Sequence, residues 1–114
     1  MSSPVEVVQQ YAAALASGDF AAARSFLADD LHFIGPIDEF HRADDYVTAI
    51  QRLFSMVRGV EEQATVAQDA EVVRLYVLDT PVANAPVAEW FTVSDGRIAT
   101  LRAYFDARPF APPA

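Results

Sequence analysis

The 114-residue sequence contains no cysteine and no lysine, and it has only four glycines and two histidines. The absence of cysteine excludes disulfide bonds and thiolate metal sites. His32 and His41 fit no spacing that is typical of a metal-ligand motif, so we expect neither a metal nor a cofactor. The four glycines form no phosphate-binding loop, and no Gly-x-Ser-x-Gly nucleophile motif is present.

Positive charge is scarce. Sixteen acidic residues stand against eight arginines, which gives a net charge of −8 and a pI near 4.4. Such a chain repels the phosphates of nucleic acids and anionic membranes, so we expect neither as a partner. No apolar run is long enough to cross a bilayer, and the N-terminus lacks the order of a signal peptide, so the expected location is the cytoplasm.

Helical patterns occupy the first half of the chain. The SPVE motif at residues 3–6 combines a capping box with proline at the first helical position, and Gly18 should end this helix. Asp19 is a suitable N-cap for a short second helix that carries Leu27 inward and ends at the acidic pair after it. Residues 43–57 place apolar side chains along one stripe and predict a third helix.

Alternating patterns occupy the second half. They predict four strands, at residues 60–68, 71–78, 86–93 and 97–105, after a short strand at 31–35 and a loop at 35–42. The turn at 94–96 indicates an antiparallel hairpin. Three helices and a strand followed by a four-stranded meander indicate an α+β fold, a single domain over residues 1–114 with an extended tail from 108 to 114.

Glu89 is the most informative residue in this pattern. It alternates with Val87 and Phe91 on the apolar face of its predicted strand. If that face points into the protein, burial raises the pKa of the carboxyl and suits it to proton transfer. The alternative is that Glu89 pairs with an arginine such as Arg74 or lies at the rim.

Further candidates come from the first helix and from the loop at 35–42. Tyr11 lies on the apolar face of the helix and could donate a hydrogen bond to a ligand oxygen, although a hydroxyl that reaches the surface is the alternative. Asp38 is our first choice and His41 our second for a base at the mouth of a pocket, although both residue types are usually solvated in such loops. Periodicity leaves open which way Arg74 points, because both faces of its strand are apolar.

Four segments carry a resemblance to a known family: VVQQYAAALASGDFAAARSFLADD, LHFIGP, DDYVTAIQRLF and WFTVSDGRIATLRAYFDARPF. The chain resembles the nuclear-transport-factor-two-like, or SnoaL-like, proteins, which include ketosteroid isomerases, polyketide cyclases and limonene epoxide hydrolases. The resemblance implies a cystatin-like α+β barrel, a cone of three helices closed by a strongly curved, mixed or antiparallel sheet around a deep pocket.

The resemblance also implies roles for particular residues. Tyr11 matches the tyrosine that hydrogen-bonds the dienolate in ketosteroid isomerases, and Glu89 matches a protonated aspartate if the following hairpin is one residue shorter here. The base of those enzymes lies in an Asp-Pro pair, where this chain has Gly35-Pro36. The limonene epoxide hydrolases carry a catalytic aspartate where this chain has Ala103, so their water-activating triad is missing.

The expected function is therefore that of a small-molecule enzyme of the isomerase or cyclase type, acting on an apolar carbonyl or epoxide ligand without a cofactor. A binding or dimerisation module without chemistry is the alternative. The residues expected to line the pocket are Phe33, Phe54, Arg74, Val87, Phe91, Leu101, Ala103 and Phe105.

The face of the last two predicted strands that points away from the pocket indicates that the chain forms an oligomer. Trp90 and Tyr104 should form an apolar patch there, with Ile98 beside them, and we expect a two-fold homodimer through this face. The alternative is that the tail from Arg108 folds back over the patch.

Overall fold

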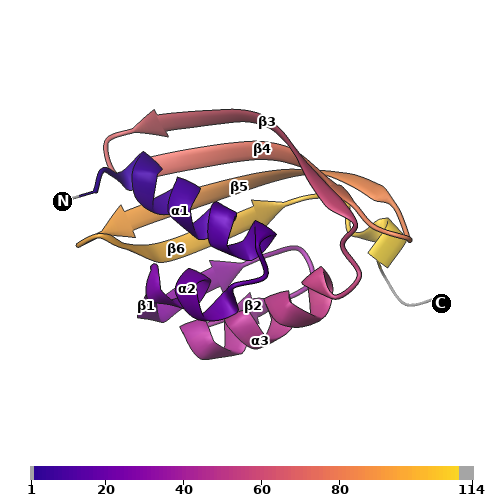
Figure 1. Cartoon of the computed structure of the whole chain (residues 1–114), viewed down its shortest axis with the longest axis horizontal. Helices are drawn as coiled ribbons and strands as arrows, with labels where there is room; N and C mark the ends of the chain where they lie inside the picture. Colours follow the sequence, from indigo (N-terminus) through magenta and orange to yellow (C-terminus); the bar gives the residue numbers. More distant parts are fainter. Residues whose placement is uncertain (1, 111–114) are drawn as a thin grey trace.

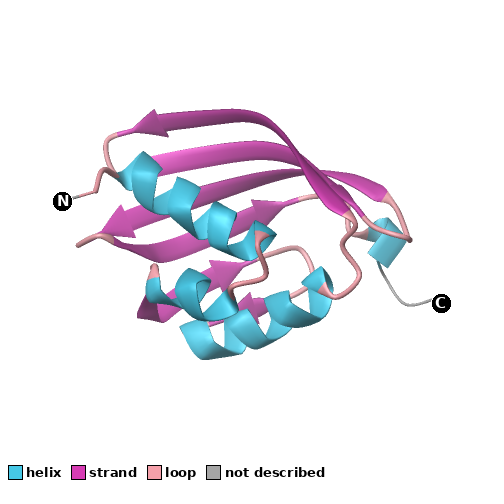
Figure 2. Ribbon diagram, viewed as in Figure 1, coloured by secondary structure: helices cyan, strands magenta, loops and turns pink. Residues whose placement is uncertain are grey.

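The structure is a computed structural model that describes residues 2–110. Its helices are α1 (Pro4–Ala16), α2 (Phe20–Ser25), α3 (Ala43–Phe54) and a 3-10 helix, η1 (Arg108–Phe110). Its strands are β1 (Leu27–Ile34), β2 (Glu39–Phe40), β3 (Gly59–Gln68), β4 (Glu71–Asp79), β5 (Asn84–Ser94) and β6 (Arg97–Tyr104). The mixed α+β class expected from the sequence is confirmed (Figure 2).

The capping residues of the first two helices act as the sequence predicts. The Ser3 hydroxyl accepts a hydrogen bond from the backbone N–H of Glu6, whose side chain accepts one in return from the backbone of Ser3. Asp19 caps α2 by accepting from the backbone N–H of Ala22. These caps set where each helix begins, and therefore which side chains of α1 turn toward the sheet.

One mixed sheet has the strand order β2-β1-β6-β5-β4-β3. The meander from β3 to β6 is antiparallel as predicted, whereas β1 runs parallel to β6. The described strands do not close into a complete barrel, because β2 and β3 form two open edges. All three α-helices lie on one face of this curved sheet, and no described helix covers the other (Figure 1).

Several element boundaries differ from the sequence prediction. Leu27 begins β1 instead of ending α2, because its backbone pairs with β6 beside Ile98. The predicted loop at 35–42 contains β2, which pairs with the end of β1. The tail was predicted to be extended from Arg108, but its first three residues form η1, where Phe110 packs edge-on against Phe105. Residues 111–114 of that tail lie outside the described part of the chain.

The faces of β5 and β6 alternate as expected up to one irregularity. Val87, Glu89 and Phe91 point inward and are buried. A register shift between Thr92 and Val93 turns Ile98 into the core, although the sequence argument placed it on the outer face. The main core packs all three α-helices against the sheet, and a second, smaller buried cluster of Leu78, Ala85 and Val87 forms part of the wall of a cavity.

Candidate functional site

A cavity of about 200 Å³ lies between α3, the inner face of β4 to β6 and the loop that follows β1. Its lining is mostly apolar, and among the described residues its polar side chains come from four: Asp38, Tyr46, Tyr76 and Glu89. Phe110 of η1 also belongs to the wall, so the first part of the C-terminal tail helps to form the cavity. An apolar hollow with a few converging polar groups is the usual form of a small-molecule site.

Glu89 is held in this wall by Arg74 on the neighbouring strand. The two residues are register partners on β5 and β4, so both side chains leave the sheet on the inner face. The Nη1 atom of Arg74 donates to Oε1 of Glu89 at 3.0 Å, and both side chains are buried. Glu89 therefore combines two alternatives from the sequence, because it faces the cavity and also pairs with Arg74.

The surroundings of Glu89 favour its protonated form relative to a carboxyl in water. Burial raises the pKa of Glu89 above its ordinary value of 4.5, and the attraction of Arg74 and a hydrogen bond with Tyr76 offset only part of that rise. Burial lowers the pKa of Arg74, but the attraction of Glu89 and Glu62 outweighs it and keeps the guanidinium charged. The pair thus provides a carboxyl that is shifted toward neutral pH beside a permanent cation.

Arg74 also connects the cavity to a second hollow. Its Nη2 atom donates to Oε1 of Glu62 on β3, whose side chain is half exposed. This second hollow has a volume of about 140 Å³ and lies beneath α1 and α3. Tyr46, Tyr76 and Glu89 line both hollows. Arg74 therefore joins a buried carboxylate to one that reaches solvent.

Two tyrosines form a buried pair close to Glu89. The hydroxyls of Tyr11 on α1 and Tyr46 on α3 lie 2.6 Å apart. Burial is the main cause that raises the pKa of each phenol well above its ordinary value, and the charge of Glu89 raises both further. Both hydroxyls therefore stay protonated at neutral pH. Tyr46 lines the cavity and Tyr11 lies behind it, so Tyr46 is the hydroxyl that a ligand would contact.

Asp38 lies at the mouth of the cavity. A tight turn positions it, in which the backbone N–H of Gly35 donates to the carbonyl of Asp38 at 2.9 Å. A side chain at position 35 would meet the ring of Phe33 at 2.9 Å, so glycine is needed for this close approach. The carboxylate of Asp38 is therefore presented from an exposed turn.

The structure brings together part of the predicted set. Glu89, Asp38, Phe33, Val87, Ala103 and Phe105 line the main cavity, and Phe54 and Arg74 line the second hollow. Phe91 and Leu101 were expected in the pocket, but they belong to the closed core. His41 was expected near the mouth, yet it does not line the cavity and its side chain is 74% exposed.

Tyr46 and Tyr76 are the candidate residues that the sequence argument missed. Tyr46 belongs to the apolar stripe of α3, where an aromatic residue indicates only a core position. Tyr76 shares its strand face with Arg74, and that face was left undecided because the opposite one is equally apolar. Knowing that Glu89 points inward settles the question, because its register partner Arg74 must then point inward as well.

The shifted pKa of Glu89 can be measured directly. We expect a carboxyl-carbon NMR titration to show Glu89 ionising above 4.5, because burial is the dominant cause acting on it. A pKa of Glu89 at or below 4.5 would mean that Arg74 outweighs burial.

The described residues contain no helix that is long and apolar enough to span a membrane.

The sequence matches the profile of the SnoaL-like domain over residues 8–101. A search of curated proteins gives no match.

Solved structures with the same fold are numerous. A protein from Kribbella flavida is 28% identical with a TM-score of 0.86, over 92% of this chain and 88% of its own. An LEH-like epoxide hydrolase of M. tuberculosis is 26% identical with a TM-score of 0.74, over 93% and 84%. An NTF2-like protein of unknown function from Cytophaga hutchinsonii is 20% identical with a TM-score of 0.84, over 96% of both chains. The chain has the fold of NTF2-like proteins and belongs to the SnoaL-like family.

Proposed function

We propose that this protein is an enzyme that transfers protons on a small apolar carbonyl compound bound in the main cavity. The observation that carries the proposal is Glu89, a carboxylate that is buried within the described chain and yet faces a hollow. A buried carboxyl with a raised pKa ionises nearer to neutral pH, where a group can both accept and return a proton.

The tyrosine hydroxyls around the cavity could stabilise the negative charge that such a proton transfer creates on the ligand. Removing a proton from the carbon next to a carbonyl moves negative charge onto the carbonyl oxygen. Tyr46 offers a protonated hydroxyl there, and its contact with Tyr11 polarises that hydroxyl. Glu89 then takes the proton from one carbon and returns it to another, which is an isomerisation with no net gain or loss of atoms. Asp38 at the mouth is the second candidate for the base.

The size of the cavity limits the ligand. A volume of about 200 Å³ is below the roughly 300–1,000 Å³ that is typical of drug-sized ligands. The wall includes Phe33, Val87 and Phe105, which favour an apolar body with one polar oxygen. We therefore propose a compact monocyclic or short-chain ketone as the substrate class.

The test uses 3-cyclohexen-1-one, whose isomerisation to the conjugated ketone is followed by ultraviolet absorption. We expect turnover by the wild type and a loss of about 10²–10⁴-fold in Glu89→Gln, because that variant cannot carry the proton. Affinity for the saturated ketone cyclohexanone should persist in Glu89→Gln, since the amide keeps the shape of the wall.

Two further variants complete this experiment. Glu61→Gln removes an exposed carboxylate on β3 and should leave the rate unchanged. Asp38→Asn separates the two candidate bases, because a larger loss there than in Glu89→Gln would assign the base to the mouth. Binding of cyclohexanone without turnover in the wild type would favour the binding module and contradict proton transfer on this class of ketone.

Epoxide hydrolysis is a second candidate, supported by one further observation. Arg74 holds Glu62 and Glu89 on its two terminal nitrogens, so one cation links an exposed carboxylate and a buried one. One carboxylate activating water and another donating a proton is a chemically complete set for opening an epoxide. The 26% identical M. tuberculosis protein is an LEH-like epoxide hydrolase. Production of a diol from cyclohexene oxide, lost in Glu62→Gln as well as in Glu89→Gln, would favour this candidate.

A further inference from the structure

A cluster of two histidines and one carboxylate lies on the outer side of the β1–β2 hairpin. The register pairs Phe33 with Phe40 and Ile34 with Glu39. Continuing this antiparallel register by one residue places His41 opposite His32. Because side chains alternate between the two faces of a strand, His32, Glu39 and His41 share one face and the two phenylalanines share the other.

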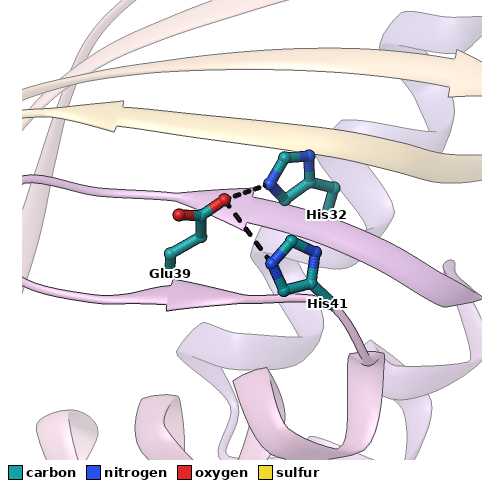
Figure 3. Close-up of side chains that lie close together, drawn as sticks. All are labelled: His32, Glu39 and His41. Atoms are coloured by element: carbon teal, nitrogen blue, oxygen red, sulfur yellow. Dashed lines mark hydrogen bonds and ion pairs between the residues drawn. The ribbon is translucent and has the colours of Figure 1, made fainter.

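The three side chains converge, as Figure 3 shows. Oε2 of Glu39 lies 2.6 Å from Nε2 of His32 and 3.6 Å from Nε2 of His41. The two imidazole rings are stacked with their centroids 4.7 Å apart. One donor atom from each residue falls within 4.8 Å of the others. An ion bound at roughly 2.0–2.2 Å from each donor fits a cluster of this size after small rotations of exposed side chains.

We propose that His32, Glu39 and His41 form a binding site for a divalent transition-metal ion such as Zn²⁺ or Ni²⁺. Two neutral imidazoles and a carboxylate are ligands that these ions prefer, whereas Mg²⁺ and Ca²⁺ select oxygen donors. Three protein ligands at an exposed position leave the remaining coordination positions to water. The sequence alone predicts no metal, because the spacing of these residues matches no ligand motif.

The position of the site would let a bound ion act on the mouth of the cavity. His32 belongs to β1, Glu39 to β2 and His41 to the link into α3. An ion bound to all three would tie together both ends of the turn that carries Asp38. The opposite face of this hairpin presents Phe33 and Phe40 to the cavity. Metal binding should therefore hold the mouth of the cavity in one arrangement, without any ligand entering the cavity itself.

The site stands independently of the chemistry proposed for Glu89. None of its three ligands lines the cavity among the residues that the structure describes. The test therefore uses metal binding alone, with untagged protein that has been freed of metal, at about pH 7.5, because protons compete with metal ions for imidazole nitrogen.

Isothermal titration with Zn²⁺, Ni²⁺ and Mg²⁺ is the primary experiment. We expect one equivalent of Zn²⁺ or Ni²⁺ to bind, with at least tenfold weaker binding in His41→Ala and in Glu39→Gln. At a Zn²⁺ concentration about 100-fold above Kd, the melting temperature should rise by roughly 10 °C. The control Glu61→Gln removes an exposed carboxylate from the opposite edge of the sheet and should bind as the wild type does.

NMR distinguishes this site from scattered surface binding. One ion should shift the imidazole nitrogens of His32 and His41 together, in step with the amide signals of the turn at 35–38. Three outcomes would overturn the proposal. They are no saturable binding of Zn²⁺ or Ni²⁺ up to about 1 mM, equal binding of Mg²⁺, and unchanged affinity in His41→Ala. Because His41 is 74% exposed, its replacement leaves folding intact and the result interpretable.

Discussion

Replacing Arg74 with methionine is expected to destabilise the protein by up to about 3 kcal/mol at pH 7. The substitution keeps the length and apolar stem of the side chain but leaves Glu89 buried without its cation. Glu89 can then avoid an unpaired charge by taking a proton. Protonating a carboxyl with an ordinary pKa of 4.5 at pH 7 costs about 3 kcal/mol, since each pH unit corresponds to about 1.36 kcal/mol. This is the upper limit of the effect, because the raised pKa of Glu89 already imposes part of this cost on the wild type.

The same reasoning fixes the pH dependence of the effect. The pKa of Glu89 is already raised in the wild type, so the folded protein holds its proton to higher pH than the unfolded chain does. Stability linked to Glu89 is therefore present below pH 4.5 and is lost as the pH rises through the folded pKa. Without Arg74 the folded pKa rises further, so Arg74→Met should cost little near pH 4.5 and progressively more toward pH 7.

Urea unfolding at pH 5 and pH 7 measures this difference. The double variant Arg74→Met/Glu89→Gln removes both charges and should recover most of the stability lost at pH 7. Arg58 provides the control, because it pairs with Asp79 at an exposed position and Arg58→Met should cost less than about 1 kcal/mol. An equal cost of Arg74→Met at both pH values would show that packing, and not the charge of Glu89, sets the effect.

The element order could be predicted from the sequence because its signals are local. The capping box before Pro4 and the alternation through β4 to β6 depend on residues that are close in sequence. The boundary at Leu27 could not be predicted in this way. Leu27 continues the apolar face of α2 and suits a strand equally well, and the choice depends on its parallel pairing with β6, far along the chain.

The residues of the candidate site could likewise be predicted only where their signal is local in the sequence. Glu89 could be found from the sequence because a carboxylate interrupts an otherwise apolar strand face. The contact between Tyr11 and Tyr46 joins two helices, and neither helix predicts it alone. The cluster of His32, Glu39 and His41 was missed because β2 has only two residues, too few for an alternation to be recognised.

The outer face of the sheet is covered by no helix among the described residues. Val66, Leu75, Trp90 and Tyr104 expose apolar surface there, and the three α-helices lie on the other face. The predicted alternative, a tail folded over this patch, is not seen as far as Phe110, which packs at the cavity instead. Beside Trp90, the Nη1 atom of Arg102 is buried and has no hydrogen-bond partner among the described residues.

We therefore propose that two copies of the chain pair through this face about a two-fold axis, each offering the other an acceptor for Arg102. Trp90 lies on this face with its ring beneath the guanidinium of Arg102, so Trp90→Glu should weaken the dimer by at least about 2 kcal/mol, or roughly 30-fold in Kd. Sedimentation equilibrium at micromolar concentration measures the change. The control Val82→Glu places the same charge at an exposed apolar residue in the β4–β5 connection and should leave the dimer intact. A monomeric wild type, or a dimer that tolerates Trp90→Glu, would show that this face is not the interface.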